Sequence, residues 1–358
     1  MCTGGTVTAR TYLMHQDNPV DQIIVIGASS GGLMALRKLL AQLPSDLQAA
    51  VFITMHIGDQ PSLLPSLLAK ASSLDIDFAL SGETLKNGRV YVAPPDQHLL
   101  IKRGTLQLVR GAKENYSRPA IDPMFRSAAV SYAEGAIGVI LTGELDDGVV
   151  GLQAIKAYRG RVYVQDPETA EAPSMPMNAL RHVEVDACLP LDELGSALGR
   201  LVQQRAPEAH APREPKRIEP YATENDLTED LSSGGAYALD AIGKVSGVSC
   251  PECGGSLWEL GAAPLRFRCH TGHSYTSAAL FHAQNEMIEE ALWVAIRAMH
   301  EKQLLLGRQI QSNKDVGRTG AVKEYELASE GLEGHKNTLR ALVTRLRPVS
   351  SSRAQTPK

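Results

Sequence analysis

Three runs of apolar residues constrain the fold of this 358-residue chain: IIVIG (23–27), AAVFITM (49–55) and AIGVILTG (136–143). A continuous apolar run is typical of a strand that is buried on both faces of a parallel sheet. The residues after each run show helical periodicity. Pro44 ends the helical pattern that follows the first run. Strands that alternate with helices predict an α/β fold, a doubly wound and mainly parallel sheet with flanking helices.

The composition changes near residue 205, where a stretch rich in Pro, Ala and charge is typical of a linker. A short stretch rich in Cys and Gly follows, and two long helical patterns separated by DVGRTG come after it. Such a break between two helical patterns predicts an antiparallel pair. We therefore predict a flexible arm over residues 1–20, the α/β domain over 21–204, a linker over 205–245, a small Cys-rich module over 246–276, a helical hairpin over 277–346 and a disordered tail over 347–358.

Polar side chains follow each of the three apolar runs. Ser29 follows the first run, His56 the second, and both Asp146 and Asp147 the third. The carboxyl ends of parallel strands meet at one edge of a sheet, and ligands of α/β proteins bind there. A histidine can take the proton of a serine hydroxyl near neutral pH, and a carboxylate can orient the imidazole. These residues therefore favour a Ser-His-Asp hydrolase, in which the helix after Ser29 offers N–H groups to an oxyanion.

Other interpretations of the first turn are weaker. Gly27-Ala28-Ser29-Ser30-Gly31 fits the G-x-S-x-G pattern, whereas a phosphate-binding loop requires a lysine that this turn lacks. A dinucleotide-binding turn would have its second glycine at Ser29 and an acidic residue where His56 stands. A purely structural His56 and a helix-capping role for the aspartates stay open on these patterns alone.

The Cys-rich module contains four residues with the spacing of a metal site: Cys250-x2-Cys253-x15-Cys269-x3-His273. Thiolates and imidazole suit a tetrahedral Zn²⁺ ion, and Gly254-Gly255 permit the first tight turn. His270 competes as the fourth ligand, but the x3 spacing of His273 makes chelation easier. The odd number of clustered cysteines disfavours disulfides. We therefore expect a zinc-ribbon-like module whose zinc is structural.

Five motifs between residues 21 and 204 together resemble one family. They are IGASSGG, TMHIGDQ, VYVAPPDQHLLI, RPAIDPMFRSAA and GVILTGELDDGVVGLQAIKAYRG. In this order, they resemble the catalytic domain of the CheB-type protein-glutamate methylesterases of bacterial chemotaxis. The resemblance implies that Ser29 is the nucleophile, His56 the general base and Asp147 the orienting acid. It also places Ser30, Gly31 and Glu144 at the oxyanion and substrate-binding positions, with Glu144 where the family has methionine.

The resemblance implies a serine hydrolase that demethylates glutamate methyl esters and releases methanol. The implied partner is a methylated chemoreceptor or a related signalling protein, and some members also deamidate receptor glutamines. No cofactor is implied for catalysis. The alternative is a catalytically weakened signalling adaptor that binds partners through its C-terminal module. Glu144 favours it, as does the position of Ser29, which is too near the start of the sequence for the family's usual receiver domain to precede it.

Composition argues against two classes of partner. The formal net charge of −4 gives no reason to expect nucleic acid. No apolar stretch approaches the roughly 20 residues of a membrane span, and the first residues have no apolar core of signal-peptide length. We therefore expect a cytoplasmic protein that does not insert into membranes.

Overall fold

The computed structural model describes residues 20–204, 216–230, 235–262 and 265–345. The predicted arm and tail lie outside these residues, except for Val20. The chain divides into two compact units, Met1–Ile242 and Gly243–Lys358, and each is described by itself. In the described residues, no helix is long and apolar enough to cross a membrane.

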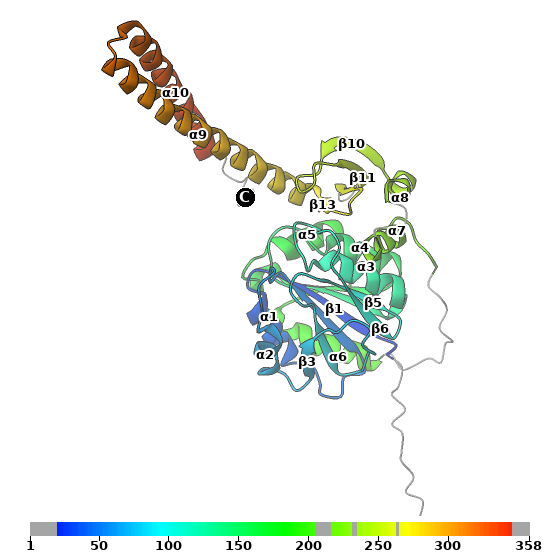
Figure 1. Cartoon of the computed structure of the whole chain (residues 1–358). Helices are drawn as coiled ribbons and strands as arrows, with labels where there is room; N and C mark the ends of the chain where they lie inside the picture. Colours follow the sequence, from blue (N-terminus) through cyan, green and yellow to red (C-terminus); the bar gives the residue numbers. More distant parts are fainter. Residues whose placement is uncertain (1–19, 205–215, 231–234, 263–264, 346–358) are drawn as a thin grey trace, which may run out of the picture. The chain divides into compact units, whose positions relative to one another are not determined.

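The first unit is built on a seven-stranded sheet in the order β3-β4-β2-β1-β7-β8-β9. Figure 1 shows this sheet with helices packed around it. All neighbouring strands of this sheet are parallel. The strands are β1 (Ile23–Ala28), β2 (Ala50–Met55), β3 (Asp75–Phe78), β4 (Arg89–Val92), β7 (Ala136–Ile140), β8 (Arg161–Gln165) and β9 (Ala187–Leu189). A separate antiparallel hairpin is formed by β5 (His98–Lys102) and β6 (Thr105–Val109).

Helices cover both faces of this sheet, because alternate residues of the central strand point to opposite sides. Ile24 and Ile26 pack into one apolar core with α1 (Gly32–Leu40), α2 (Leu64–Ala69) and α6 (Leu191–Gln204). Ile23 and Val25 pack into the other with α3 (Ile121–Tyr132), α4 (Val149–Ala157) and α5 (Ser174–His182). These two layers confirm the predicted doubly wound fold, with a sheet that is entirely parallel.

The register of the sheet brings the predicted site residues to one edge. Ala28 is paired with Met55, and Gly27 is paired with both Thr54 and Ile140. The residues that follow these three strands therefore leave the sheet at nearly the same level. This is why a serine, a histidine and an aspartate that are far apart in sequence can meet.

The stretch from 205 to 245, which we predicted to be a linker, contains two helices. They are α7 (Tyr221–Glu229) and α8 (Gly235–Ile242). Leu227 and Thr228 of α7 are buried, and the Thr228 hydroxyl contacts both Arg126 of α3 and Glu114, at 2.9 and 2.8 Å. Part of the buried face of α7 is therefore polar and contacts a buried ion pair. The α7 part of this stretch is therefore a packed element of the first unit.

The second unit consists of a small antiparallel sheet and two long helices. The sheet has the order β10-β11-β12-β13 and joins Lys244–Ser249, Ser256–Ala262, Leu265–Cys269 and Ser274–Thr276. Helix α9 (Ser277–Asp315) is followed by α10 (Thr319–Arg345). Gln303 of α9 contacts Lys336 of α10, and Lys314 contacts Glu326, so the two helices run antiparallel.

Candidate active site and metal-binding cluster

Ser29 lies in the tight turn between β1 and α1. Its backbone N–H donates to the Thr142 carbonyl oxygen at 3.0 Å, and its own carbonyl accepts from Gly32 at 2.8 Å. Gly31 has φ of 75° in this turn, and a Cβ there would lie 2.7 Å from Cβ of Glu171. Glycine is therefore required both for the left-handed backbone and for the close approach of Glu171.

His56 connects Ser29 with Asp147. The Ser29 hydroxyl lies 3.1 Å from Nδ1 of His56, and the Nε2 atom of that ring lies 2.7 Å from Oδ2 of Asp147. The His56 side chain is 21% exposed and that of Asp147 is 3% exposed, so the carboxylate is shielded while the imidazole can be reached. An ionised carboxylate can only accept hydrogen bonds, so Nε2 carries the proton and Nδ1 is left to accept the serine proton.

The Asp147 carboxylate also accepts three hydrogen bonds from the protein. The backbone N–H groups of Ile121 and Asp122 donate at 2.7 and 3.2 Å, and the Asn115 side-chain amide donates at 2.8 Å. Burial alone would raise the pKa of Asp147, but His56, the Ile121 N–H and Asn115 outweigh burial and lower this pKa. Asp147 is thus held ionised and oriented at the start of α3.

A second buried carboxylate, Asp122, lies beside this triad. Its two oxygens accept from the Asn115 amide at 2.8 Å and from the Gly151 N–H at 2.7 Å. Burial raises the pKa of Asp122 well above its usual value, and the charge of Asp147 adds to the rise. Asn115 and Asp122 were missed by sequence reasoning, although Asp122 belongs to the quoted motif RPAIDPMFRSAA.

Ser30 and Gly31 follow Ser29 at the mouth of the site. Ser30 is exposed, and its carbonyl accepts from the Thr142 hydroxyl at 2.9 Å. Within the described residues, the backbone N–H groups of Ser30 and Gly31 donate to no backbone carbonyl. Both groups start the helix α1, whose dipole favours negative charge at this end.

The loop after β7 closes the other side of Ser29. A Cβ at Gly143 would lie 2.9 Å from Cβ of Ser29, so the loop packs directly on the serine. Glu144 and Leu145 are exposed, and Leu145 has a left-handed backbone with φ of 62°. Asn178 fixes this backbone by donating to the Leu145 carbonyl at 2.7 Å. The structure thus places Glu144 at the rim of the site with its side chain toward solvent.

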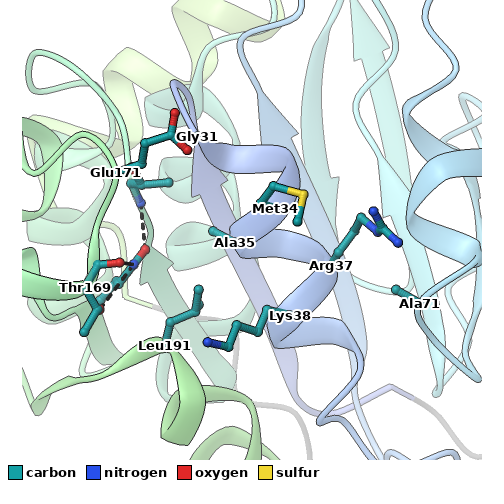
Figure 2. A pocket seen from close by; sticks show the side chains of 11 residues that line it. Gly31, Met34, Ala35, Arg37, Lys38, Ala71, Thr169, Glu171 and Leu191 are labelled. Atoms are coloured by element: carbon teal, nitrogen blue, oxygen red, sulfur yellow. Dashed lines mark hydrogen bonds between the residues drawn. The ribbon is translucent and has the colours of Figure 1, made fainter.

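A separate pocket of about 410 Å³ lies beside Gly31 (Figure 2). Residues of α1, among them Met34, Ala35 and Lys38, form one side, and Glu171 and Leu191 lie opposite. The lining contains none of Ser29, His56 and Asp147. We therefore assign this pocket no part in the chemistry of the triad.

Comparisons with known proteins show the family to which the first unit is related. The model of the family described as CheB methylesterase matches residues 24–198. A putative protein-glutamate methylesterase/protein-glutamine glutaminase of Leptospira interrogans is 40% identical over 184 residues, which are 51% of this chain and 95% of that protein. The chain belongs to the CheB methylesterase family.

Two further relatives are named as methylesterases. A protein-glutamate methylesterase/protein-glutamine glutaminase of Anaeromyxobacter dehalogenans is 38% identical over 183 residues, covering 51% of this chain and 54% of that protein. The CheB methylesterase catalytic domain of Thermotoga maritima, a crystal structure, has 34% identity and a TM-score of 0.48, covering 50% of this chain and 98% of that one. The CheB family match ends at residue 198, so α7 and the second unit lie outside it.

The second unit of this CheB-family chain brings four potential metal ligands together. One ligand atom from each of Cys250, Cys253, Cys269 and His273 lies within 4.8 Å of all the others. The Cys253 and Cys269 sulfurs are 3.7 Å apart, and Nδ1 of His273 lies 3.5 Å from the Cys269 sulfur. A disulfide has a sulfur separation of about 2 Å, whereas sulfurs at the corners of a zinc tetrahedron are about 3.8 Å apart. The spacing therefore fits a four-coordinate metal ion.

Two tight turns present these ligands. The Cys250 N–H donates to Gly255 at 2.7 Å in the first turn, and the Cys269 N–H donates to the His273 carbonyl at 2.9 Å in the second. His270 is not part of the group, because its ring packs on Gly255, where a Cβ would meet it at 2.4 Å. The geometry thus favours His273 over His270 as the fourth ligand.

Proposed function

We propose that this chain is a serine hydrolase that demethylates glutamate methyl esters of a chemoreceptor-like protein and releases methanol. The observation that carries the proposal is the continuous path from the Ser29 hydroxyl through His56 to Asp147, at 3.1 and 2.7 Å. Two relatives are named protein-glutamate methylesterase/protein-glutamine glutaminase, which supports the substrate class and extends the proposal to glutamine deamidation.

In the first step, the Ser29 oxygen attacks the ester carbonyl while Nδ1 of His56 accepts the hydroxyl proton. The carbon–oxygen bond to the methoxy group then breaks, and the proton on Nδ1 leaves with the methoxide as methanol. In the second step, His56 deprotonates a water molecule, which attacks the glutamyl ester on Ser29. The bond between the acyl carbon and the Ser29 oxygen then breaks, the proton on Nδ1 returns to that oxygen, and the product acid loses its proton to solvent. A glutamate carboxylate and the free serine remain, and no cofactor takes part. Asp147 stabilises the imidazolium in both steps.

Two backbone N–H groups support the developing negative charge. Those of Ser30 and Gly31 make no backbone hydrogen bond within the described residues and begin α1. Preorganised donors of this kind stabilise a tetrahedral intermediate more than the ground-state ester. Because the Glu144 side chain is exposed, it stands at the rim and can remain solvated during the reaction. We therefore assign the oxyanion to the Ser29–Gly31 turn.

The metal proposed for Cys250, Cys253, Cys269 and His273 is a structural Zn²⁺ ion. Four protein ligands complete a tetrahedron and leave no position for a substrate. The apolar core of the small sheet contains few residues, and Cys250 and Cys269 are two of them. A module with so small a core usually needs a metal or a comparable staple to fold. Zinc would therefore hold the sheet of the second unit together.

The chain's organisation follows from these roles. We assign catalysis to residues 21–204, the zinc-ribbon-like module to 246–276 and the helical hairpin to 277–346. The proposed partner is a methylated chemoreceptor or a related signalling protein, which implies a cytoplasmic location for the reaction. Methanol release from methylated receptor membranes tests this function directly.

The assay compares the wild type with Ser29→Ala, and Ser66→Ala on the exposed face of α2 is the matched control. We expect methanol from the wild type and from Ser66→Ala, and only background from Ser29→Ala. Absence of methanol from the wild type would favour the adaptor alternative. Equal release by Ser29→Ala would exclude the serine mechanism.

A further inference from the structure

A second pocket, of about 480 Å³, opens beside the catalytic histidine and is not used by the chemistry above. His56 is part of its wall, so a group bound there lies next to the reacting ester. The loop of residues 110–119 forms much of the remaining wall. The charged side chains that line the pocket are those of Asp59, Asp96, Arg110, Lys113 and Arg118.

Two of the three cations are already paired. Nε of Arg118 donates to Oδ1 of Asp96 at 2.8 Å, and Nη2 of Arg110 lies 2.5 Å from Oδ2 of the same carboxylate. The hydrogen bond from Arg118 is the largest cause of the lowered pKa of Asp96. Asp96 therefore stays ionised and is fully engaged by the two arginines, one of which, Arg110, is still largely exposed.

Lys113 differs from the two arginines. Its side chain is half-buried, and in the part of the chain that the structure describes its ammonium group makes no hydrogen bond or ion pair. The ammonium lies 5.6 Å from the centre of the Tyr116 ring, which is a weak cation–π contact. A cation that faces a pocket in this way is available to an anionic ligand.

The loop that carries Lys113 is held in place at both ends. Nε2 of the buried His98 ring donates to the Ala112 carbonyl at 2.9 Å, and Nδ1 of the same ring accepts from the Ala120 N–H at 3.2 Å. Burial lowers the pKa of His98, which is therefore neutral and able to do both. The ammonium of Lys113 is thus presented from a fixed backbone, so little conformational entropy is lost when it binds a partner.

Ser29 has carboxylates on its other flank. Glu171 lies against Gly31 (Figure 2), and Glu144 is exposed in the loop after β7. Negative charge therefore lies beside the Ser29 turn, whereas the His56 pocket has a net charge of +1, since its three cations outnumber the carboxylates of Asp59 and Asp96. A substrate segment with an acidic side chain can bind favourably in one orientation, with that side chain toward Lys113.

We infer that the pocket beside His56 is a subsite for a carboxylate of the substrate polypeptide that lies close in space to the methylated glutamate. Lys113 binds this carboxylate and so makes the protein prefer substrates that carry it. The inference rests on the proposed function, since it names a feature of the same substrate. The ligand is an acidic side chain of the protein substrate.

The test uses two short helical peptides with one γ-methyl glutamate each. One peptide carries a glutamate four residues away, on the same helix face, and the other carries glutamine there. Wild type is compared with Lys113→Gln and Lys113→Glu, and Lys70→Gln, at the exposed end of α2, is the matched control. Hydrolysis is followed by methanol release, and binding is measured separately with the Ser29→Ala protein.

We expect the wild type to prefer the acidic peptide by about fivefold in kcat/KM, the size of a single favourable ion pair. Lys113→Gln should remove the preference, Lys113→Glu should reverse it, and Lys70→Gln should keep it. The same order is expected for binding to Ser29→Ala. Equal affinity of Ser29→Ala for both peptides, or a preference that survives Lys113→Gln, would overturn the subsite. Failure of the proposed function would appear differently, as selective binding without methanol release by the wild type.

Discussion

Asn115 joins Asp122 to Asp147: its side-chain amide donates to an oxygen of each carboxylate, at 2.8 Å in both cases. All three residues are buried. Two carboxylates in such an environment repel each other unless donors separate them or one is protonated. Asn115 supplies these donors, and the raised pKa of Asp122 keeps the negative charge on the carboxylate that faces His56.

Replacing Asn115 by alanine should slow the reaction without abolishing it. The loss of a buried hydrogen bond to a charged group costs about 1.5–3 kcal/mol, which corresponds to roughly a 10–100-fold lower kcat. KM for a small neutral ester should change little, because Asn115 does not line the mouth of the site. The measurement is the separate determination of kcat and KM on a variant that is shown to be folded. Unchanged kcat would show that Asp147 needs no such support.

Asp147→Asn and Ser29→Ala should differ in severity. In other Ser-His-Asp hydrolases, loss of the carboxylate costs about 10⁴-fold and loss of the nucleophile about 10⁶-fold in kcat. The same order is expected here, because Asp147 contacts the His56 ring, which in turn contacts Ser29. Single-turnover kinetics on a small ester measure both variants. Equal losses in the two variants would contradict the assigned roles.

Asp122 should make stability depend on pH. Its pKa is raised in the folded protein, so the folded state binds more protons than the unfolded state above about pH 4, the usual pKa of aspartate. The free energy of unfolding should therefore fall as the pH rises from about 4 toward the folded pKa. Denaturant titrations at several pH values measure this slope. Asp122→Asn should be less stable at acidic pH, because its amide NH2 group would face a hydrogen-bond donor. Its unfolding free energy should also fall less steeply as the pH rises. If this pH dependence stayed the same as in the wild type, it would come from groups other than Asp122.

Helix α7, which lies outside the residues matched by the CheB family, should stabilise the loop that contains Asn115. Thr228 contacts the fully buried Arg126–Glu114 pair, and Glu114 directly precedes Asn115. Thr228→Val leaves this pair without one partner and should cost about 1–3 kcal/mol of unfolding free energy. Urea denaturation of the full chain checks the value, and Thr319→Val at the exposed start of α10 is the control. Equal unfolding free energies for the two variants would remove α7 from this role.

Zinc should be present at one ion per chain and should affect only the second unit. Elemental analysis of the purified protein measures the zinc content. Cys253→Ser should lose the ion, because only three of the four ligands remain. Hydrolysis of a small ester should persist in this variant, since its triad is intact. Metal-free wild type with an unaltered unfolding transition of the second unit would contradict a structural zinc.

Much of the first unit could be predicted from local patterns, because a strand buried on both faces must be continuously apolar. The polar residues that end β1 and β2 are also visible in sequence, and the parallel topology explains why Ser29 and His56 meet. Asn115 could not be found in this way. It lies in a loop without periodicity, and its contact with Asp147 joins residues 32 positions apart in sequence.

Helix α7 was hidden for a related reason. Its sequence, YATENDLTE, contains few apolar residues, and a polar stretch near several prolines is typical of a linker. Its buried face includes Glu224 and Thr228, and Thr228 contacts the buried Arg126, while Tyr221 at its start packs against the apolar core. Patterns of hydrophobicity cannot reveal a helix that packs through polar partners.

We propose that His56 and Asp147 activate Ser29 as a nucleophile. Covalent labelling with a fluorophosphonate, followed by mass spectrometry of the digested protein, tests it most directly. We expect one adduct, on Ser29, which is absent from Ser29→Ala and forms far more slowly in His56→Ala. An adduct on another serine, or equal labelling of His56→Ala and the wild type, would contradict it.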